Sequence, residues 1–287
     1  MYRLSYYPWL TQNVPQEVIA AQINMFAREI EVQLTRLGRA GEQVRVLPPL
    51  EVPEQIDQIV GGGADIALMN PLGFIFARRR SGNVEAIAVA QRIIDGRRGI
   101  VYFAQLYTHK RSAIRSLAHA AGRSIGFGLP YSTSNFLIPA AMLKEAGVHP
   151  LAGFSRVEFL KGHEVVARAV YEGKVDIGAG HDGVVLDLSN QPGYGDASDV
   201  LIQLARSPPI PSDPVVVSVL ESGERGMLKS AIVAAGNTEV GIGALKIFWG
   251  NTQGLEATTT EFYQSLNDAL LALKFEEMDL LPRKRTL

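Results

Sequence analysis

Ser132, Thr133 and Ser134 place three hydroxyl side chains next to one another in the sequence, and such groups can donate hydrogen bonds to a ligand. They follow an apolar stretch at 125–128 that is typical of a strand, and they precede an apolar stretch at 136–146 that is typical of a helix. The first amides of a helix lack partners within it, and the helix dipole attracts negative charge. Hydroxyls beside such amides predict an oxyanion site. Simple N-capping of the helix is the competing interpretation.

Two further segments carry side chains that suit an anion. His163 follows Gly162 and precedes an amphipathic stretch at 165–171, so its imidazole is a candidate donor at a helix start. His181 and Asp182 stand where a short apolar strand is expected to end. Asp182 would orient an imidazole or accept a hydrogen bond from a protonated ligand oxygen. A surface or capping role is the competing interpretation for His163, and capping is the competing interpretation for Asp182.

Several catalytic and metal-binding motifs fail in their context. The segment 122–126 matches the nucleophile-elbow pattern, but its serine leads into a strand, whereas the elbow requires a strand before it and a helix after it. The sequence contains no P-loop, metalloprotease helix motif or complete dinucleotide fingerprint. No two histidines are four residues apart, so we expect neither a metal nor a cofactor. The basic run 78–80 is interpreted as a solvated helix end.

Hydrophobic spacing predicts the elements that position these side chains. A β-like run at 3–7 precedes residues 18–37, where apolar side chains recur every three or four positions, as in an amphipathic helix. A strand at 44–47, a helix at 52–60 and a buried strand at 65–69 continue the pattern. Strands that alternate with helices predict βαβ units and a parallel sheet.

A partial internal repeat favours two similar α/β lobes. Residues 62–67 resemble residues 172–179: each segment has a helix stop and then Asp-Ile at the start of an apolar strand. A polar loop follows, with Asn70 in the first copy and His181 and Asp182 in the second. Because open α/β sheets bind ligands at the carboxyl ends of their strands, both loops are candidate binding segments. A pattern common to all βαβ proteins is the alternative interpretation.

The C-terminal third begins with a segment of unusual proline density. Four of the eight residues at 207–214 are proline, which makes the segment stiff and extended and favours a fixed return crossing over a flexible linker. Residues 230–244 and 259–273 are predicted to be helical, and 283–285 form a basic tail.

Composition excludes several classes of protein. The chain has 287 residues, 47% of them hydrophobic and 20% charged, which suits about two domains with a sizeable core. A net charge of −1 excludes the basic field of a general nucleic-acid binder. The absence of cysteine excludes disulfides and thiolate metal sites. No segment approaches the roughly 20 apolar residues of a membrane span, so we expect no direct membrane insertion.

The N-terminal residues lack a charged leader followed by an apolar stretch. The expected location is therefore periplasmic or extracytoplasmic if a signal peptide has been removed, and cytoplasmic otherwise.

The hydroxyl turn is part of a wider pattern. In chain order, the segments 132–135, 162–164, 175–176 and 207–214 resemble the phosphate, phosphite and phosphonate substrate-binding proteins of ABC importers, within the type II periplasmic binding proteins. The resemblance covers almost the whole chain. It implies an α/β protein with two hinged lobes, each a mostly parallel sheet flanked by helices, which close on a small phosphorus oxyanion. An ABC transporter permease is the implied partner.

The resemblance also carries binding roles onto individual residues. The hydroxyls of Ser132, Thr133 and Ser134 would donate to the oxyanion, His163 would contact the same group, and Asp182 is the nearest match to the family's acidic residue. The first lobe is expected to comprise residues 1–103 and 205–287, and the second residues 104–204. Asn70 and the N-terminal loop of the first lobe are expected to complete the site.

The sequence departs from the family pattern at two positions. Asn135 stands where the family usually has glycine, and Met69 and Asn70 stand where a tyrosine is common. Aromatic contacts would come instead from Tyr7, Trp9 and Tyr102, although core packing is the alternative for aromatic residues at strand ends. Alternative functions are the binding or cytosolic sensing of a sulfonate or an organic phosphate ester, and a less favoured hydrolase built from Ser132, His163 and Asp182.

Overall fold

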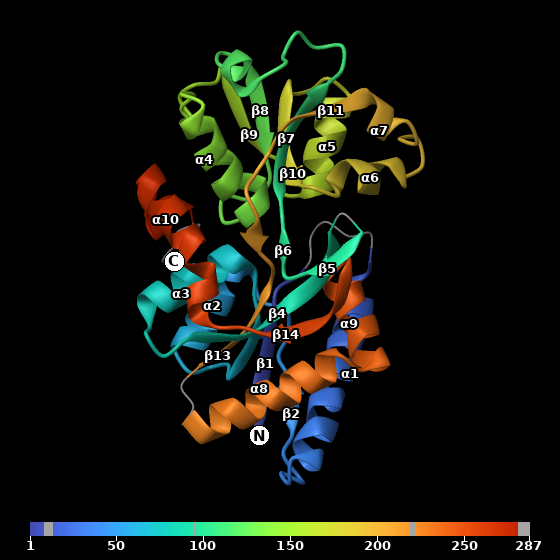
Figure 1. Cartoon of the computed structure of the whole chain (residues 1–287), viewed down its shortest axis with the longest axis vertical. Coiled ribbons are helices and arrows are strands. Elements are labelled where there is room, and N and C mark those ends of the chain that lie inside the picture. The colour runs from blue at the N-terminus through green and yellow to red at the C-terminus, as the bar shows by residue number, and fades with distance from the viewer. Residues whose placement is uncertain (9–13, 95, 219–221, 281–287) are drawn as a thin grey trace, which may run out of the picture. The chain divides into compact units, whose positions relative to one another are not determined.

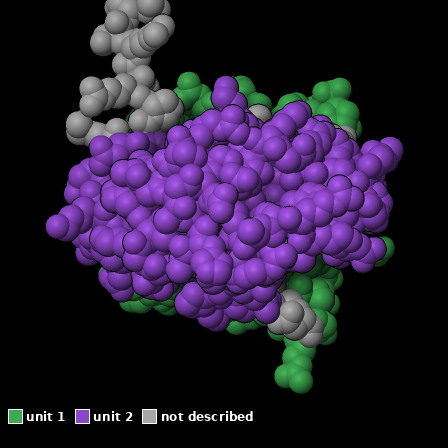
Figure 2. All heavy atoms as spheres, turned by 90° about the horizontal axis from the view of Figure 1, so that it is seen from above, with its two compact units in different colours: residues 1–101, 211–264 green, residues 102–210, 265–287 purple. Residues whose placement is uncertain are grey.

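The computed structural model describes residues 1–8, 14–94, 96–218 and 222–280 (Figure 1). The chain divides into two compact units, which Figure 2 distinguishes by colour. Unit 1 comprises Met1–Val101 and Pro211–Gln264, and unit 2 comprises Tyr102–Ile210 and Ser265–Leu287.

The C-terminal segment corrects the expected division of the chain. We expected all of 205–287 to return to the first lobe, but residues 205–210 and the segment from Ser265 onward belong to unit 2. The ring of Phe275 stacks on that of Phe136 with centroids 5.7 Å apart, and Lys144 donates to the carbonyl of Ala272. These long-range contacts have no local sequence signal.

Unit 1 is built on a seven-stranded sheet. Its strands are β1 (Tyr2–Tyr6), β2 (Val44–Val46), β3 (Ile66–Leu68), β4 (Glu85–Ile94), β5 (Arg97–Gly99), β13 (Pro214–Val217) and β14 (Thr252–Ala257). The order is β14-β4-β13-β3-β1-β2, with β5 paired to β4. β1 is parallel to both β2 and β3, which confirms the predicted βαβ pattern, and β13 runs antiparallel to β3.

The helices of unit 1 confirm the N-terminal predictions closely. They are α1 (Gln16–Arg36), α2 (Val52–Val60), α3 (Pro71–Arg80), α8 (Ser222–Gly236), α9 (Glu239–Trp249) and the 3₁₀ turn η3 (Thr260–Tyr263). The apolar stripe of α1, including Ile23, Phe26 and Ile30, is buried, and α1 packs against α8 and α9 (Figure 1).

The helix predicted over 230–244 is interrupted in the structure. α8 ends at Gly236, where a Cβ would lie 2.4 Å from the side chain of Leu255, and Thr238 caps α9 by accepting the amide of Gly241 at 3.0 Å. The prediction was wrong here because both segments share an apolar periodicity that continues across the break.

Among the described residues, no single helix is both long and apolar enough to cross a membrane. Within the same residues, the pair α8 and α9, which is bent by 86° at its junction, meets those criteria of length and composition when the two helices are taken together.

Unit 2 is built on a five-stranded sheet in the order β11-β7-β10-β8-β9. These strands are β7 (Ala104–His109), β8 (Ser124–Phe127), β9 (Arg156–Phe159), β10 (Ile177–His181) and β11 (Leu201–Arg206). β8 is parallel to β9 and β10, whereas β7 runs antiparallel to β10. Two short strands at the ends of the unit's main segment, β6 (Val101–Tyr102) and β12 (Ile210–Pro211), pair with each other.

The helices of unit 2 include those that follow the carboxyl ends of its parallel strands. They are the 3₁₀ turn η1 (Leu117–Ala120), the π turn η2 (Thr133–Leu137), α4 (Ile138–Glu145), α5 (His163–Tyr171), α6 (Val184–Ser189), α7 (Ala197–Val200), α10 (Gln264–Leu273) and α11 (Glu277–Leu280). Val166 and Val170 of α5 pack with Tyr107, Val184 and Leu188 in the core of the unit. β8, β9 and β10 thereby position the segments that carry the candidate binding side chains.

Candidate functional site

The hydroxyl turn lies where β8 gives way to a helix, as the sequence predicts. Ser132 is the N-cap of η2, and its hydroxyl oxygen accepts the amide N–H of Asn135 at 3.2 Å. The capping interpretation is therefore correct for Ser132. Thr133 and Ser134 are buried in the first turn, at 2% and 3% exposure, and no hydrogen bond joins the Ser134 hydroxyl to another described residue. Ser134 retains a hydroxyl that can serve a ligand.

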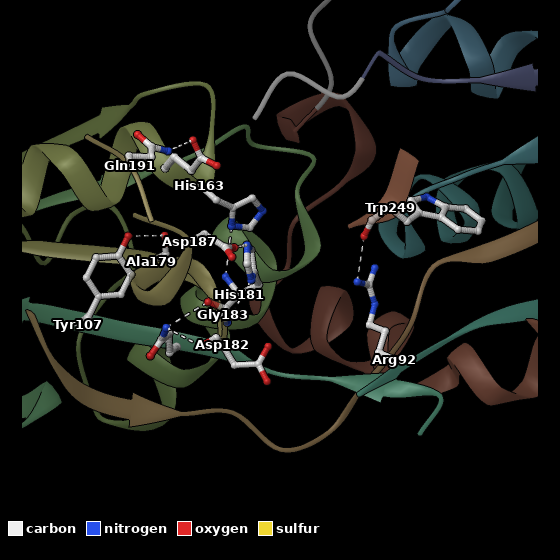
Figure 3. A network of polar contacts seen from close by, with 12 residues as sticks. Arg92, Tyr107, His163, Ala179, His181, Asp182, Gly183, Asp187, Gln191 and Trp249 are labelled. Atoms are coloured by element: carbon white, nitrogen blue, oxygen red, sulfur yellow. Dashed lines mark hydrogen bonds and ion pairs between the residues drawn. The ribbon is translucent and has the colours of Figure 1, made fainter. Parts of the chain in front are cut away.

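His163 is the first residue of α5, and β9 leads into it. Its Nδ1 accepts the backbone N–H of His181 at 3.2 Å, which leaves the proton of a neutral ring on Nε2 (Figure 3). Burial lowers the pKa of His163 well below its ordinary value, and the nearby His181 lowers it further. His163 is thus a neutral imidazole with one fixed acceptor and one N–H to donate.

A second imidazole, that of His181, packs against the first. The two ring centroids are 4.7 Å apart (Figure 3). His181 Nδ1 accepts the amide of Gly183 at 3.1 Å, and His181 Nε2 lies 3.4 Å from the carboxylate of Asp187 on α6. Burial raises the pKa of Asp187, and the charge of Asp182 raises it further. Sequence analysis pointed to His181 but missed its pairing with His163 and with Asp187.

Asp182 follows β10 and is held by its backbone. Its amide donates to the carbonyl of Phe103 at 3.0 Å, and its carbonyl accepts Gln105 Nε2 at 3.2 Å. The N-cap of α6 is Gly183, so the capping interpretation of Asp182 was wrong. Its carboxylate lies 3.5 Å from Arg206 Nη2, yet burial raises its pKa above the ordinary value. Sequence analysis gave no signal for Arg206, whose guanidinium lies 3.7 Å from the centroid of the Phe103 ring.

Strand topology brings these segments together. The hydroxyl turn follows β8, His163 follows β9, and His181 and Asp182 follow β10. Since β9, β8 and β10 are parallel neighbours, their carboxyl ends share one edge of the sheet. That edge offers hydroxyl and imidazole N–H donors beside a partly buried carboxylate, which suits a small anion that keeps a proton.

The remaining candidate residues, which belong to unit 1 except for Tyr102 of unit 2, are mostly engaged in capping or buried in the core. Asn70 follows β3 and caps α3, with its Oδ1 accepting the amide of Gly73 at 2.6 Å. Tyr7 is buried, and its hydroxyl accepts Trp249 Nε1 at 3.2 Å. Tyr102 of β6 is also buried, and Trp9 lies outside the described residues. Binding roles for all four stay predictions.

A buried ion pair in unit 1 escaped sequence analysis. Arg92 of β4 pairs with Asp213 of the proline-rich segment and donates to the Ser212 hydroxyl at 2.8 Å. It also donates to the Trp249 carbonyl at 3.1 Å (Figure 3). Burial raises the pKa of Asp213 despite the neighbouring guanidinium. The pair holds Asp213 against β4 of unit 1. Its partners lie too far apart in the sequence for spacing to join them.

The rejected nucleophile-elbow motif has a structural explanation. Ser124 of the nucleophile-elbow match opens β8 and donates to the carboxylate of Asp176 at 2.6 Å, so it holds two strands together. Among the described residues, no group of three or more histidine, aspartate or glutamate side chains is arranged to hold a metal ion.

Comparison with known proteins gives a family match and similar folds. Residues 10–263 match the family model described as ABC transporter, phosphonate, periplasmic substrate-binding protein. The fold is similar to that of a binding protein component of an ABC phosphonate transporter from Pseudomonas aeruginosa, with a TM-score of 0.70 and 21% identity over 95% of this chain and 86% of that one.

Two further solved structures share the fold. PhnD1 from Prochlorococcus marinus in complex with methylphosphonate gives a TM-score of 0.71 and 21% identity, over 95% of this chain and 98% of that one. A Xanthomonas citri protein bound to a chloride ion gives a TM-score of 0.77 and 17% identity over the same shares of the two chains.

Proposed function

Because the chain belongs to the family of periplasmic phosphonate-binding proteins of ABC transporters, we propose that it captures a phosphonate, phosphite or phosphate anion and delivers it to a membrane permease. The family consists of substrate-binding transport proteins rather than enzymes. The periplasm is accordingly the proposed location of this chain, and an ABC permease is its proposed partner.

The observation that carries this proposal is the pair of neutral donors at the carboxyl edge of unit 2. The hydroxyl turn and the Nε2–H of His163 follow neighbouring parallel strands. Hydrogen bonds from such groups to an anion are stronger than bonds between neutral partners, so an oxyanion can be held without a direct cation. The buried first turn of η2 adds backbone amides to the same edge.

We propose that Asp182 selects ligands by their protons. A carboxylate accepts a hydrogen bond from a protonated oxygen of phosphonate or phosphite, whereas fully ionised sulfate meets it with unrelieved repulsion. The raised pKa of Asp182 marks a partly desolvated carboxylate, for which repulsion is strong.

Calorimetric titration tests the function directly. The protein would first be unfolded and refolded to remove any retained ligand. Phosphite, phosphate, methylphosphonate, 2-aminoethylphosphonate and sulfate would then be titrated in turn. We expect one-to-one binding of at least one phosphorus oxyanion, with sulfate inert. Absence of heat with every compound would contradict the proposal.

Asp182→Asn tests the selectivity within that function. The amide keeps the shape of the side chain, removes its charge and adds an N–H₂ donor that sulfate can use, so we expect weaker binding of the protonated ligand and measurable binding of sulfate. Unchanged selectivity between the two would exclude the proposed role of Asp182.

One assay distinguishes the proposed binding protein from a hydrolase that uses Ser132. The Ser132 hydroxyl already accepts the amide of Asn135, and no hydrogen bond joins Ser132 to His163 among the described residues. We expect no turnover of phosphate or carboxylate esters. Turnover that is lost in Ser132→Ala would favour the enzyme.

A further inference from the structure

The hydroxyl turn contains a buried polar atom without a partner. Asn135 is 1% exposed, and its side-chain Oδ1 accepts no hydrogen bond. In the described part of the chain the other such atoms are Gln55 Oε1, Arg168 Nε and Thr252 Oγ1. Of these four atoms, only Asn135 Oδ1 belongs to the segment that would bind the anion. A buried acceptor without a donor is destabilising, so its presence in this turn calls for a functional explanation.

Contacts on both sides fix the position of Asn135. Its amide N–H donates to the Ser132 hydroxyl at 3.2 Å, and its carbonyl accepts the amide of Gly128 at 3.3 Å. Its side-chain amide fills the space that a Cβ of Gly128 would occupy, because such a Cβ would lie 2.4 Å from Nδ2 and 3.0 Å from Oδ1. The amide therefore lies between the end of β8 and the turn, directly after Ser134.

The chemistry of the unpaired atom restricts its partner. A carbonyl oxygen can only accept a hydrogen bond, so a deprotonated ligand oxygen would meet it with repulsion. A P–OH group supplies the missing donor. Sulfonates and sulfate have no such proton near neutral pH, although they match the shape of the phosphorus anions.

We propose that Asn135 is a specificity-determining residue that accepts a hydrogen bond from the protonated oxygen of a phosphonate or phosphite monoanion. This inference rests on the proposed function and adds to the site a second group that distinguishes protonated from deprotonated ligand oxygens. Asn135 acts from the β8 side, whereas Asp182 acts from the end of β10. The substrate class is accordingly a phosphorus oxyanion that retains one acidic proton.

The test compares two ligands that differ by one proton. In mildly acidic buffer, methylphosphonate is a monoanion with one P–OH group, and methanesulfonate is a monoanion of similar shape without one. For Asn135→Ala we expect about 10-fold weaker binding of methylphosphonate, the usual effect of losing one hydrogen bond, and unchanged or tighter binding of methanesulfonate, because the variant removes an oxygen that repels it. Asn135→Asp retains the acceptor and adds charge, so the preference for methylphosphonate should increase.

Controls separate recognition from packing. Thr252→Val removes another buried unpaired oxygen, on β14 of unit 1, and should change neither affinity. Thermal unfolding monitors the fold of each variant, and the nearly isosteric Asn135→Asp carries the test if Asn135→Ala fails to fold. An equal loss for both ligands, or no change in their ratio, would overturn the inference. If the unmodified protein bound neither ligand, the proposed function itself would fail.

Discussion

The two units of the molecule repeat one arrangement of strands. In unit 1 the parallel strands lie in the order β2-β1-β3, followed by the antiparallel β13; in unit 2 they lie in the order β9-β8-β10, followed by the antiparallel β7. The helices α2 and α5 connect equivalent strands in the two units. The partial repeat seen in the sequence is therefore structural, and any difference in chemistry comes from the side chains placed on a shared frame.

An aspartate fastens the strands in the same way in both units. Asp65, just before β3, accepts the backbone N–H of Arg3 at 2.7 Å, at the start of β1. Asp176, just before β10, accepts the backbone N–H of Ser124 at 2.8 Å, at the start of β8. Both lie at the amino ends of the strands, so this edge of each sheet serves stability.

The carboxyl edges differ sharply. In unit 2 they carry the hydroxyl turn, two packed imidazoles and Asp182, with one unpaired buried oxygen at Asn135. In unit 1 the end of β3 carries Asn70, whose oxygen is used in capping α3. The comparison teaches that a common scaffold can keep its folding contacts at one edge while only one copy concentrates polar binding groups at the other.

Loss of the hydroxyl turn tests this asymmetry most severely. The double change Thr133→Val and Ser134→Ala removes two donors to the anion, so we expect about 100-fold weaker binding of the preferred oxyanion by calorimetry. The matched control changes the exposed helical residues Thr35 and Ser230 in the same way and should leave affinity unchanged. A loss below about 3-fold in the double variant would assign the anion to other groups.

Substitutions of Asp65 and Asp176 test whether the amino edges of the two sheets contribute equally to stability. Asp65→Ala and Asp176→Ala should each lower the free energy of unfolding at neutral pH by about 2 kcal/mol, as urea denaturation would measure, because each leaves a strand-start amide unpaired. Ligand affinity should be unaffected. If one variant lost much of its stability and the other lost none, the two aspartates would share a geometry without contributing equally to stability.

The same variants have a predictable pH dependence. Burial alone would raise the pKa of Asp65 and of Asp176, but their hydrogen bonds with Arg3 and with Ser124, respectively, outweigh it and lower both. A lowered folded-state pKa gives stability that is present above the ordinary value of 3.8 and is lost as pH falls below it. The stability difference between wild type and variants should therefore shrink in acid, and a difference that stays constant would contradict the role of the carboxylates.

Substitutions of His163 test whether the carboxyl edge of unit 2 binds the anion through an imidazole N–H. His163→Ala removes the Nε2–H donor and should weaken oxyanion binding about 10-fold, whereas His163→Gln offers an amide donor and should retain most of the affinity. The exposed His119 changed to Gln serves as control. Nitrogen-15 chemical shifts should report a neutral ring protonated on Nε2. Equal effects of the Ala and Gln variants would show that His163 only fills space.

Stability should also depend on pH through His163. Its folded-state pKa lies well below 6.5, so the native ring stays neutral while the unfolded ring takes up a proton. Stability is therefore complete above about pH 6.5 and declines as pH falls toward the lowered folded-state pKa. His163→Gln should remove this decline in urea midpoints measured on either side of pH 6.5, and a decline unchanged from wild type would assign it to other groups.

Periodic features of the sequence predicted the frame well. The apolar stripe of α1, the Asp-Ile strand starts and the polar loops after β3 and β10 all depend on residues near one another in the chain. The hydroxyl turn and His163 were placed at helix starts for the same reason. The family resemblance supplied the phosphorus oxyanion, which spacing alone left open.

Contacts between distant residues were not predictable in this way. The pairing of His163 with His181 depends on β9 and β10 flanking β8, and the Arg92–Asp213 pair depends on the return of the chain to β4. The π turn at η2 was missed because apolar periodicity begins only at Phe136, after the turn has formed. Side-chain geometry that depends on sheet order has no signature in local spacing.

Asn70 gives the smallest expected effect and bears most directly on whether unit 1 contributes to binding. As an N-cap it stabilises α3, so Asn70→Ala should lower the free energy of unfolding by about 1 kcal/mol. Asn70→Ser keeps an acceptor for the Gly73 amide but removes the carboxamide N–H₂ that a ligand would use. If Asn70 only caps α3, the Ser variant should match wild type in both stability and affinity. If the serine variant is fully stable yet binds the oxyanion several-fold more weakly, Asn70 donates to the ligand, and the chemical asymmetry between the two carboxyl edges is one of degree.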